Sequence, residues 1–168
     1  MCLKGYLDIA VKLLGAGADA NLPNSDGCTP LARACVAGHI KIVELLANKG
    51  ANMDVTDKLE QTPIFVSVSN NRLEVVELLL ERYANYNMPN KYGETPLLRA
   101  ITNGYMKIAV VLIERGADLS IADTHGVTPL HRAAYNGQKV VVKALLDKGA
   151  NFTLKVSYCS SSCCCQQQ

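Results

Sequence analysis

The sequence has no tryptophan and only two phenylalanines among its 168 residues. A buried core must therefore be built from Leu, Ile, Val and Ala, whose modest side chains suit closely stacked helices. The formal net charge is only +2. Nucleic-acid-binding proteins usually carry a clustered basic surface, so no nucleic-acid partner is expected.

The chain also lacks an apolar run of about 18 residues that could span a membrane. Its N-terminus shows no charged segment followed by an apolar one, so no signal peptide is expected. Seven cysteines are present, which is an odd number. Free thiols are therefore favoured over a disulfide framework, and the expected location is cytoplasmic, with the nucleus as the alternative.

Signatures of catalysis are missing as well. There is no His-Glu-x-x-His pair, and no glycine-rich phosphate loop ends in Gly-Lys-Ser/Thr. Cys and His are not spaced as a nucleophile and its base. We therefore predict a protein that is not an enzyme, with no catalytic or metal-binding residues, no cofactor and no small-molecule substrate.

What the chain does contain is one period, repeated without insertion. Threonine-proline recurs every 33 residues, at Thr29-Pro30, Thr62-Pro63, Thr95-Pro96 and Thr128-Pro129. A second series keeps the same register, at Gly17-Ala18-Asp19, Gly50-Ala51-Asn52, Tyr83-Ala84-Asn85, Gly116-Ala117-Asp118 and Gly149-Ala150-Asn151. Two motifs that share one period indicate a stacked repeat array.

Each period predicts two short helices. Thr29 is suited to cap a helix, and Pro30 suits the first helical position because it needs no donor there. Gly38 is expected to end this helix, and Gly50 the next one, in the left-handed conformation that glycine adopts easily. Helices of this length are not stable alone, so stability must come from stacking.

These residues resemble the ankyrin repeat. The resemblance rests on Gly-x-Thr-Pro-Leu at 93–97 and 126–130, on Thr-Pro-Leu-His-Arg-Ala at 128–133, on Gly38-His39, and on the helix ending at 45–52. It covers residues 1 to 155 or so. It implies an all-α solenoid of helix-turn-helix units with projecting β-hairpin loops, which binds other macromolecules through its concave face and hairpin tips. His131 matches the family's structural histidine, so no catalytic role is assigned to it.

The period divides the chain into a partial repeat and four full ones. The predicted boundaries are 1–25 for the partial repeat, then 26–58, 59–91, 92–124 and 125–157, followed by a low-complexity tail at 158–168 that is predicted to be disordered. Because the first repeat lacks its front and the last is as apolar as an inner one, we expect a fragment of a longer array or a truncated gene product. The alternative is a complete natural domain.

The repeat at 59–91 departs from the pattern. It carries Glu60, Asn71 and Tyr83 where the other repeats have glycine. Residues with a Cβ enter the left-handed region at a cost of roughly 1 kcal/mol, less for Asn. We therefore predict that this repeat is degenerate and the least stable of the four full ones.

The predicted partner-binding surface consists of hairpin tips and outward residues of each first helix, which differ between repeats while the repeated frame does not. The candidates are Arg33, Lys58, Gln61, Ser69, Asn70, Lys91, Tyr92, Glu94, Arg99, Asn103, His125, Arg132, Tyr135 and Asn136. Val66 is also expected to point outward, at the place that arginine has in other repeats. The alternative is that exposed positions simply vary without function.

Three arginines, Arg33, Arg99 and Arg132, share one place in their repeats. Arginine makes two-pronged contacts with carboxylates, which suggests a protein partner with an acidic segment along this row. The alternative is that each arginine pairs locally or is solvated.

The tail holds Cys163, Cys164 and Cys165 in a row. Palmitoylation of these cysteines would tether the array to a membrane, and no other feature predicts a membrane contact. The alternative is a disordered terminus without this role. A further alternative is that the whole segment positions another domain of a larger protein, such as an enzyme, a channel or an adaptor.

Overall fold

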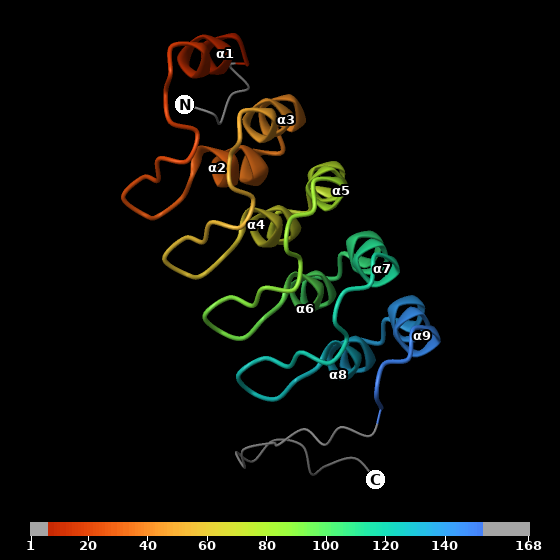
Figure 1. The fold of residues 1–168 in the computed structure, drawn as a ribbon. Helices are drawn as coiled ribbons and strands as arrows, with labels where there is room; N and C mark the ends of the chain where they lie inside the picture. Colours follow the sequence, from red (N-terminus) through yellow and green to blue (C-terminus); the bar gives the residue numbers. More distant parts are fainter. Residues whose placement is uncertain (1–6, 153–168) are drawn as a thin grey trace.

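Helix pairs follow one another along the chain, and a projecting loop precedes each pair (Figure 1). The computed structural model describes residues 7–152. In chain order the helices are α1 (Leu7–Gly15), α2 (Pro30–Ala37), α3 (Ile40–Asn48), α4 (Pro63–Ser69), α5 (Leu73–Glu81), α6 (Pro96–Thr102), α7 (Met106–Glu114), α8 (Pro129–Tyr135) and α9 (Lys139–Asp147). The all-α solenoid predicted from the sequence is confirmed.

The projecting loops have the course of hairpins, yet no β-strand forms between residues 7 and 152. The loop before α6 shows why. The Asn90 N–H donates to the Glu94 carbonyl at 2.9 Å, but the Glu94 N–H donates to the Asn90 side-chain Oδ1 at 3.0 Å. The Asn90 side chain thus accepts the hydrogen bond that a backbone carbonyl would accept in a hairpin. A regular ladder of backbone hydrogen bonds therefore does not form.

Each first helix begins at the threonine predicted to cap it. The Thr95 Oγ1 accepts a hydrogen bond from the Leu98 N–H at 3.2 Å, and Thr95 is 1% exposed. Thr29, Thr62 and Thr128 accept equivalent bonds, and a proline follows each of them in the first turn. Removing one such cap typically costs about 1 kcal/mol, so the Thr-Pro series defines where every first helix starts.

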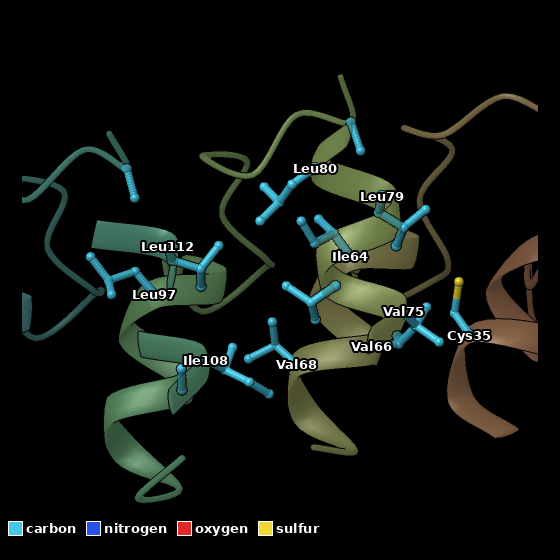
Figure 2. Packing of buried hydrophobic residues seen from close by; sticks show 14 of the residues in the cluster. Cys35, Ile64, Val66, Val68, Val75, Leu79, Leu80, Leu97, Ile108 and Leu112 are labelled. Atoms are coloured by element: carbon cyan, nitrogen blue, oxygen red, sulfur yellow. The ribbon is translucent and has the colours of Figure 1, made fainter. Parts of the chain in front are cut away.

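The helices form two rows. The first helices, α2, α4, α6 and α8, stack on one another, while α3, α5, α7 and α9 form a second row that α1 extends (Figure 1). Buried aliphatic side chains fill the space between neighbouring pairs, with Val68 of α4 and Ile108 of α7 pointing toward each other (Figure 2). Phe65 is the single fully buried aromatic side chain of the described residues.

The repeat without glycines keeps the backbone of its neighbours. Glu60, Asn71 and Tyr83 have φ values of 59°, 55° and 60°. The glycines at the same places elsewhere also have positive φ, for example 79° at Gly38 and 80° at Gly50. The stack therefore imposes the left-handed conformation on side chains that do not favour it.

Candidate functional site

The predicted surface residues lie on the loops and on the loop-facing row of helices, α2, α4, α6 and α8 (Figure 1). Those that are exposed are Lys58, Asn70, Lys91, Tyr92, Asn103, His125, Tyr135 and Asn136. Those that are half-buried are Arg33, Gln61, Ser69, Glu94, Arg99 and Arg132. We call these residues the variable surface.

One outward prediction is wrong. Val66 is only 8% exposed and belongs to the core. Figure 2 shows it on the side of α4 that also carries the contact with the preceding helix pair. Arginine at this place in other repeats has a charged end that reaches solvent past an apolar stem, whereas the short valine side chain has none. Ser69 is half-exposed, but its hydroxyl oxygen is buried and has no hydrogen-bond partner among the described residues.

An Asn or Asp near the base of each loop fixes the course of the tip. The Asn90 Oδ1 accepts from the N–H groups of Tyr92 and Glu94, at 2.9 and 3.0 Å, and Asn90 is 3% exposed. Asn24, Asp57 and Asp123 accept bonds from the equivalent N–H groups of their own loops. The tip side chains are therefore presented from a hydrogen-bonded frame and not from a free loop.

Neighbouring tips are also joined to each other. The N–H of Lys91 donates to the Leu59 carbonyl at 3.1 Å, and the N–H of Thr124 donates to the Tyr92 carbonyl at 3.1 Å. The Lys58 N–H makes the same contact with the Asp26 carbonyl at 3.3 Å. One backbone bond per repeat thus keeps the tips in a fixed row.

A third series of bonds ties the bases of successive loops together. The Asn85 N–H donates to the Asp54 Oδ1 at 2.8 Å, and the Asp118 N–H donates to the Asn87 Oδ1 at 3.0 Å. Sequence reasoning identified the Gly-Ala-Asp/Asn series but not this role. The signal was available, because Asn21, Asp54 and Asn87 recur with the same period as Thr-Pro.

Two arginines of the predicted row are paired with carboxylates nearby in the sequence, Arg99 within its own repeat and Arg132 with the end of the preceding repeat. The guanidinium of Arg99 forms an ion pair with Glu94 and lies 5.4 Å from the centre of the Phe65 ring. The guanidinium of Arg132 lies 3.4 Å from a carboxylate oxygen of Asp123, whose side chain is 4% exposed. For these two residues the structure matches the alternative interpretation, local pairing.

The other cations on the variable surface form no ion pair with a described residue. Arg33 makes no ion pair with any described residue. Lys58 and Lys91 are exposed, and the ammonium group of Lys91 lies 4.9 Å from the centre of the Tyr92 ring. Positive charge available to a partner is therefore concentrated at the tips and at Arg33.

Neither cysteine that the structure describes is activated as a nucleophile. Burial raises the pKa of the Cys35 thiol to about 12, although a hydrogen bond with Ser67 acts in the opposite direction. Partial burial and the nearby Asp57 carboxylate raise the pKa of Cys28. A reactive cysteine requires a lowered pKa, so the environments of these thiols favour the inert protonated form.

The histidine matched by resemblance has a structural contact. The Nδ1 of His131 lies 2.8 Å from the Thr128 Oγ1, and the His131 N–H also reaches that oxygen at 3.4 Å. Both contacts hold the corner where α8 begins. Among residues 7–152 no cluster of three or more His, Cys, Asp or Glu side chains is arranged to hold a metal ion.

None of the helices between residues 7 and 152 is long and apolar enough to cross a bilayer. Cys163, Cys164 and Cys165 lie outside the described residues.

A family model described as ankyrin repeats, in three copies, matches the sequence twice, over residues 1–90 and 84–156. No curated protein matches the sequence. The two matches together span nearly the whole chain and include every helix of the structure.

Proposed function

We propose that this chain, which belongs to the ankyrin-repeat family, is a non-catalytic scaffold or adaptor that binds a protein partner through its variable surface. Ankyrin repeats are in general protein–protein interaction modules. The observation that carries the proposal is that positions in the repeat fall into two groups, those that hold the fold and those that are exposed. Places that hold the frame are buried or hydrogen-bonded in every repeat, whereas exposed tip places differ, as at Asp26, Leu59, Tyr92 and His125.

A rigid surface favours binding because ordering a flexible loop on association costs free energy. The tips are held by the Asx bonds within each loop and by one backbone bond to the next tip. Two tyrosines supply large side chains on this frame, since Tyr135 is 82% exposed and Tyr92 is 49% exposed. Tyrosine is a frequent hot-spot residue at interfaces.

The Tyr92→Ala/Tyr135→Ala variant tests this proposal. A protein partner isolated with the intact chain by affinity capture is expected to bind this variant at least about tenfold more weakly, because two hot-spot side chains are lost. The affinity is measured by calorimetry with purified components. Tyr83→Ala is the matched control, because Tyr83 is 94% exposed but lies at the end of α5, away from the variable surface. The proposal would be contradicted if the unchanged chain, the Tyr92→Ala/Tyr135→Ala variant and the Tyr83→Ala variant bound the partner with equal affinity.

The finer proposal is that the partner segment is acidic. Because Arg99 and Arg132 are already paired with Glu94 and Asp123, a partner carboxylate would meet the lysines at the tips first. Lys58→Ala/Lys91→Ala is therefore expected to weaken binding about tenfold at low salt and to reduce the salt dependence of the affinity.

Lys41→Ala/Lys107→Ala removes the same charge from exposed places on the second helices and is the matched control. Arg99→Ala/Arg132→Ala tests the original row directly. If neither the lysine pair nor the arginine pair changes the affinity relative to the control, the partner segment is not acidic. In that case the Tyr92 and Tyr135 result still decides whether the variable surface binds.

Two other roles remain open as alternatives. The array would position a neighbouring domain if the chain is part of a larger protein. It would be a membrane-tethered scaffold if Cys163, Cys164 and Cys165 are palmitoylated.

A further inference from the structure

On one side of the last pair, α8 and α9, no further helix lies among the described residues (Figure 1), and the side chains on that side are largely apolar. Ala134 on α8 is exposed, Leu146 on α9 is 45% exposed, and Val142 is half-buried. The opposite side of the same pair is closed, since Ala133, Val141 and Leu145 are 0% exposed. The pair is therefore closed on the side that faces α6 and α7 and open on the other.

Most of the same places are buried where a further helix pair follows, although Ala47, at the place of Leu146, is half-buried. The places of Ala134 and Val142 are 0% exposed in the earlier pairs, where they hold Cys35, Val68, Ile101, Val43, Val76 and Ala109. The place of Leu146 is 6% exposed at Leu80 and 1% exposed at Ile113. This side of α8 and α9 thus has the composition of an inner contact and not of a polar cap, which terminal repeats usually carry.

Charged residues stand at the edge of this apolar side. Lys139, Lys143 and Asp147 of α9 line the same hollow as Val142 and Leu146. Lys143 and Asp147 are one helical turn apart and carry opposite charges. None of the three charged residues forms an ion pair with another described residue.

We propose that this side binds a second copy of the chain in a two-fold symmetric dimer, with α9 packed antiparallel on α9 of the partner. A two-fold contact requires a self-complementary surface, in which each residue pair occurs twice with the roles exchanged. The apolar pair and the opposite charges on α9 meet this requirement. A surface with charges of one sign would repel its own copy.

The register follows from the sequence of α9. If Val142 of one copy packs on Leu146 of the other, the two-fold axis makes Leu146 pack on Val142 in return. The long side chain of Lys143 is then within reach of Asp147 of the other copy, and this contact also occurs twice. Both apolar side chains lose water in the same step that pairs the charges.

Sedimentation velocity of the whole chain under reducing conditions, from about 1 to 100 µM, tests the dimer. The unchanged chain is expected to shift from monomer to dimer over this range. Leu146→Glu is expected to weaken the dimer by roughly a hundredfold, because the substitution places two charges in the contact. Val140→Glu is the matched control and should leave the dimer intact. Val140 is 63% exposed on α9, at the place of Lys41, Glu74 and Lys107 in the other pairs.

Mixing two charge-reversed variants tests the symmetry. Lys143→Glu alone and Asp147→Lys alone should each dimerise more weakly, because both contacts then join like charges. An equimolar mixture of the two should recover dimers, since every contact between unlike copies again joins opposite charges. A head-to-tail contact would give no such recovery and would produce species larger than a dimer. A chain that stays monomeric at all concentrations, or a mixture without recovery, would overturn the proposal.

Discussion

Phe65→Ala is expected to lower the free energy of unfolding by about 3–5 kcal/mol, as for other buried Phe-to-Ala changes. Phe65 is 0% exposed and lies on α4, in the middle of the described stack. The guanidinium of Arg99 lies over its ring, 5.4 Å from the ring centre, in a cation–π contact. The substitution therefore also removes a contact with the next repeat. Urea unfolding followed by circular dichroism measures the change.

The chain offers its own control for this substitution. Phe152 is the other phenylalanine of the sequence and is 77% exposed. Phe152→Ala should change the stability by less than about 0.5 kcal/mol, as is usual for surface substitutions. Phe65→Leu should cost less than Phe65→Ala, because Leu98 fills the same place on α6 and is also 0% exposed. Equal stability of the Phe65→Ala and Phe152→Ala variants would contradict the account of the core.

The helices could be predicted from the sequence because their signals are local and repeated. The threonine cap and the following proline act within one turn, and each acts four times. The positive φ at Glu60, Asn71 and Tyr83 also followed from the period alone, since glycine holds these places elsewhere. A repeat array transmits its geometry from one unit to the next, so one exception in sequence does not alter the backbone.

The contacts of the variable surface could not be predicted in the same way. The pairing of Arg99 with Glu94 depends on a glutamate that has no counterpart in the other repeats. Arg132 pairs instead with Asp123, a residue whose other oxygen holds the loop. Arginines at the same place in two repeats thus pair with different carboxylates. Each ion pair depends on neighbouring side chains that are not the same in every repeat.

For the Asn and Asp residues of the loops, the sequence shows the repeated pattern but not the structural role. Asn24, Asp57, Asn90 and Asp123 recur with the full period, so their pattern was visible. Polar residues are expected in any loop, however, and the sequence does not tell a solvated Asn from one that is 3% exposed, as Asn90 is. These four side chains matter for function, because their hydrogen bonds set the positions of the tips that the proposed partner would meet.

Replacing the three strained residues with glycine is expected to stabilise the protein. Glu60, Asn71 and Tyr83 are all exposed, so the Glu60→Gly/Asn71→Gly/Tyr83→Gly variant loses little packing. It gains relief of the left-handed strain, at roughly 1 kcal/mol for Glu and for Tyr and less for Asn. Glycine also increases the entropy of the unfolded chain, which offsets part of this gain. The expected net increase in the free energy of unfolding is at most about 1 kcal/mol, measured by urea unfolding.

The reverse substitution isolates the backbone effect. Gly116 has the place of Tyr83 in the next repeat, with a φ of 86°, and a Cβ added there meets no atom within 4 Å. Gly116→Tyr should therefore lower stability by about 1 kcal/mol through backbone strain alone. Amide hydrogen exchange measures the stability of each repeat separately. We expect the repeat at 59–91 to be the least protected full repeat in the unchanged chain. It should gain the most protection in the triple-glycine variant. If that repeat were already the best protected of the four, burial of α4 and α5 between their neighbours would outweigh the strain, and the predicted weakness would be wrong.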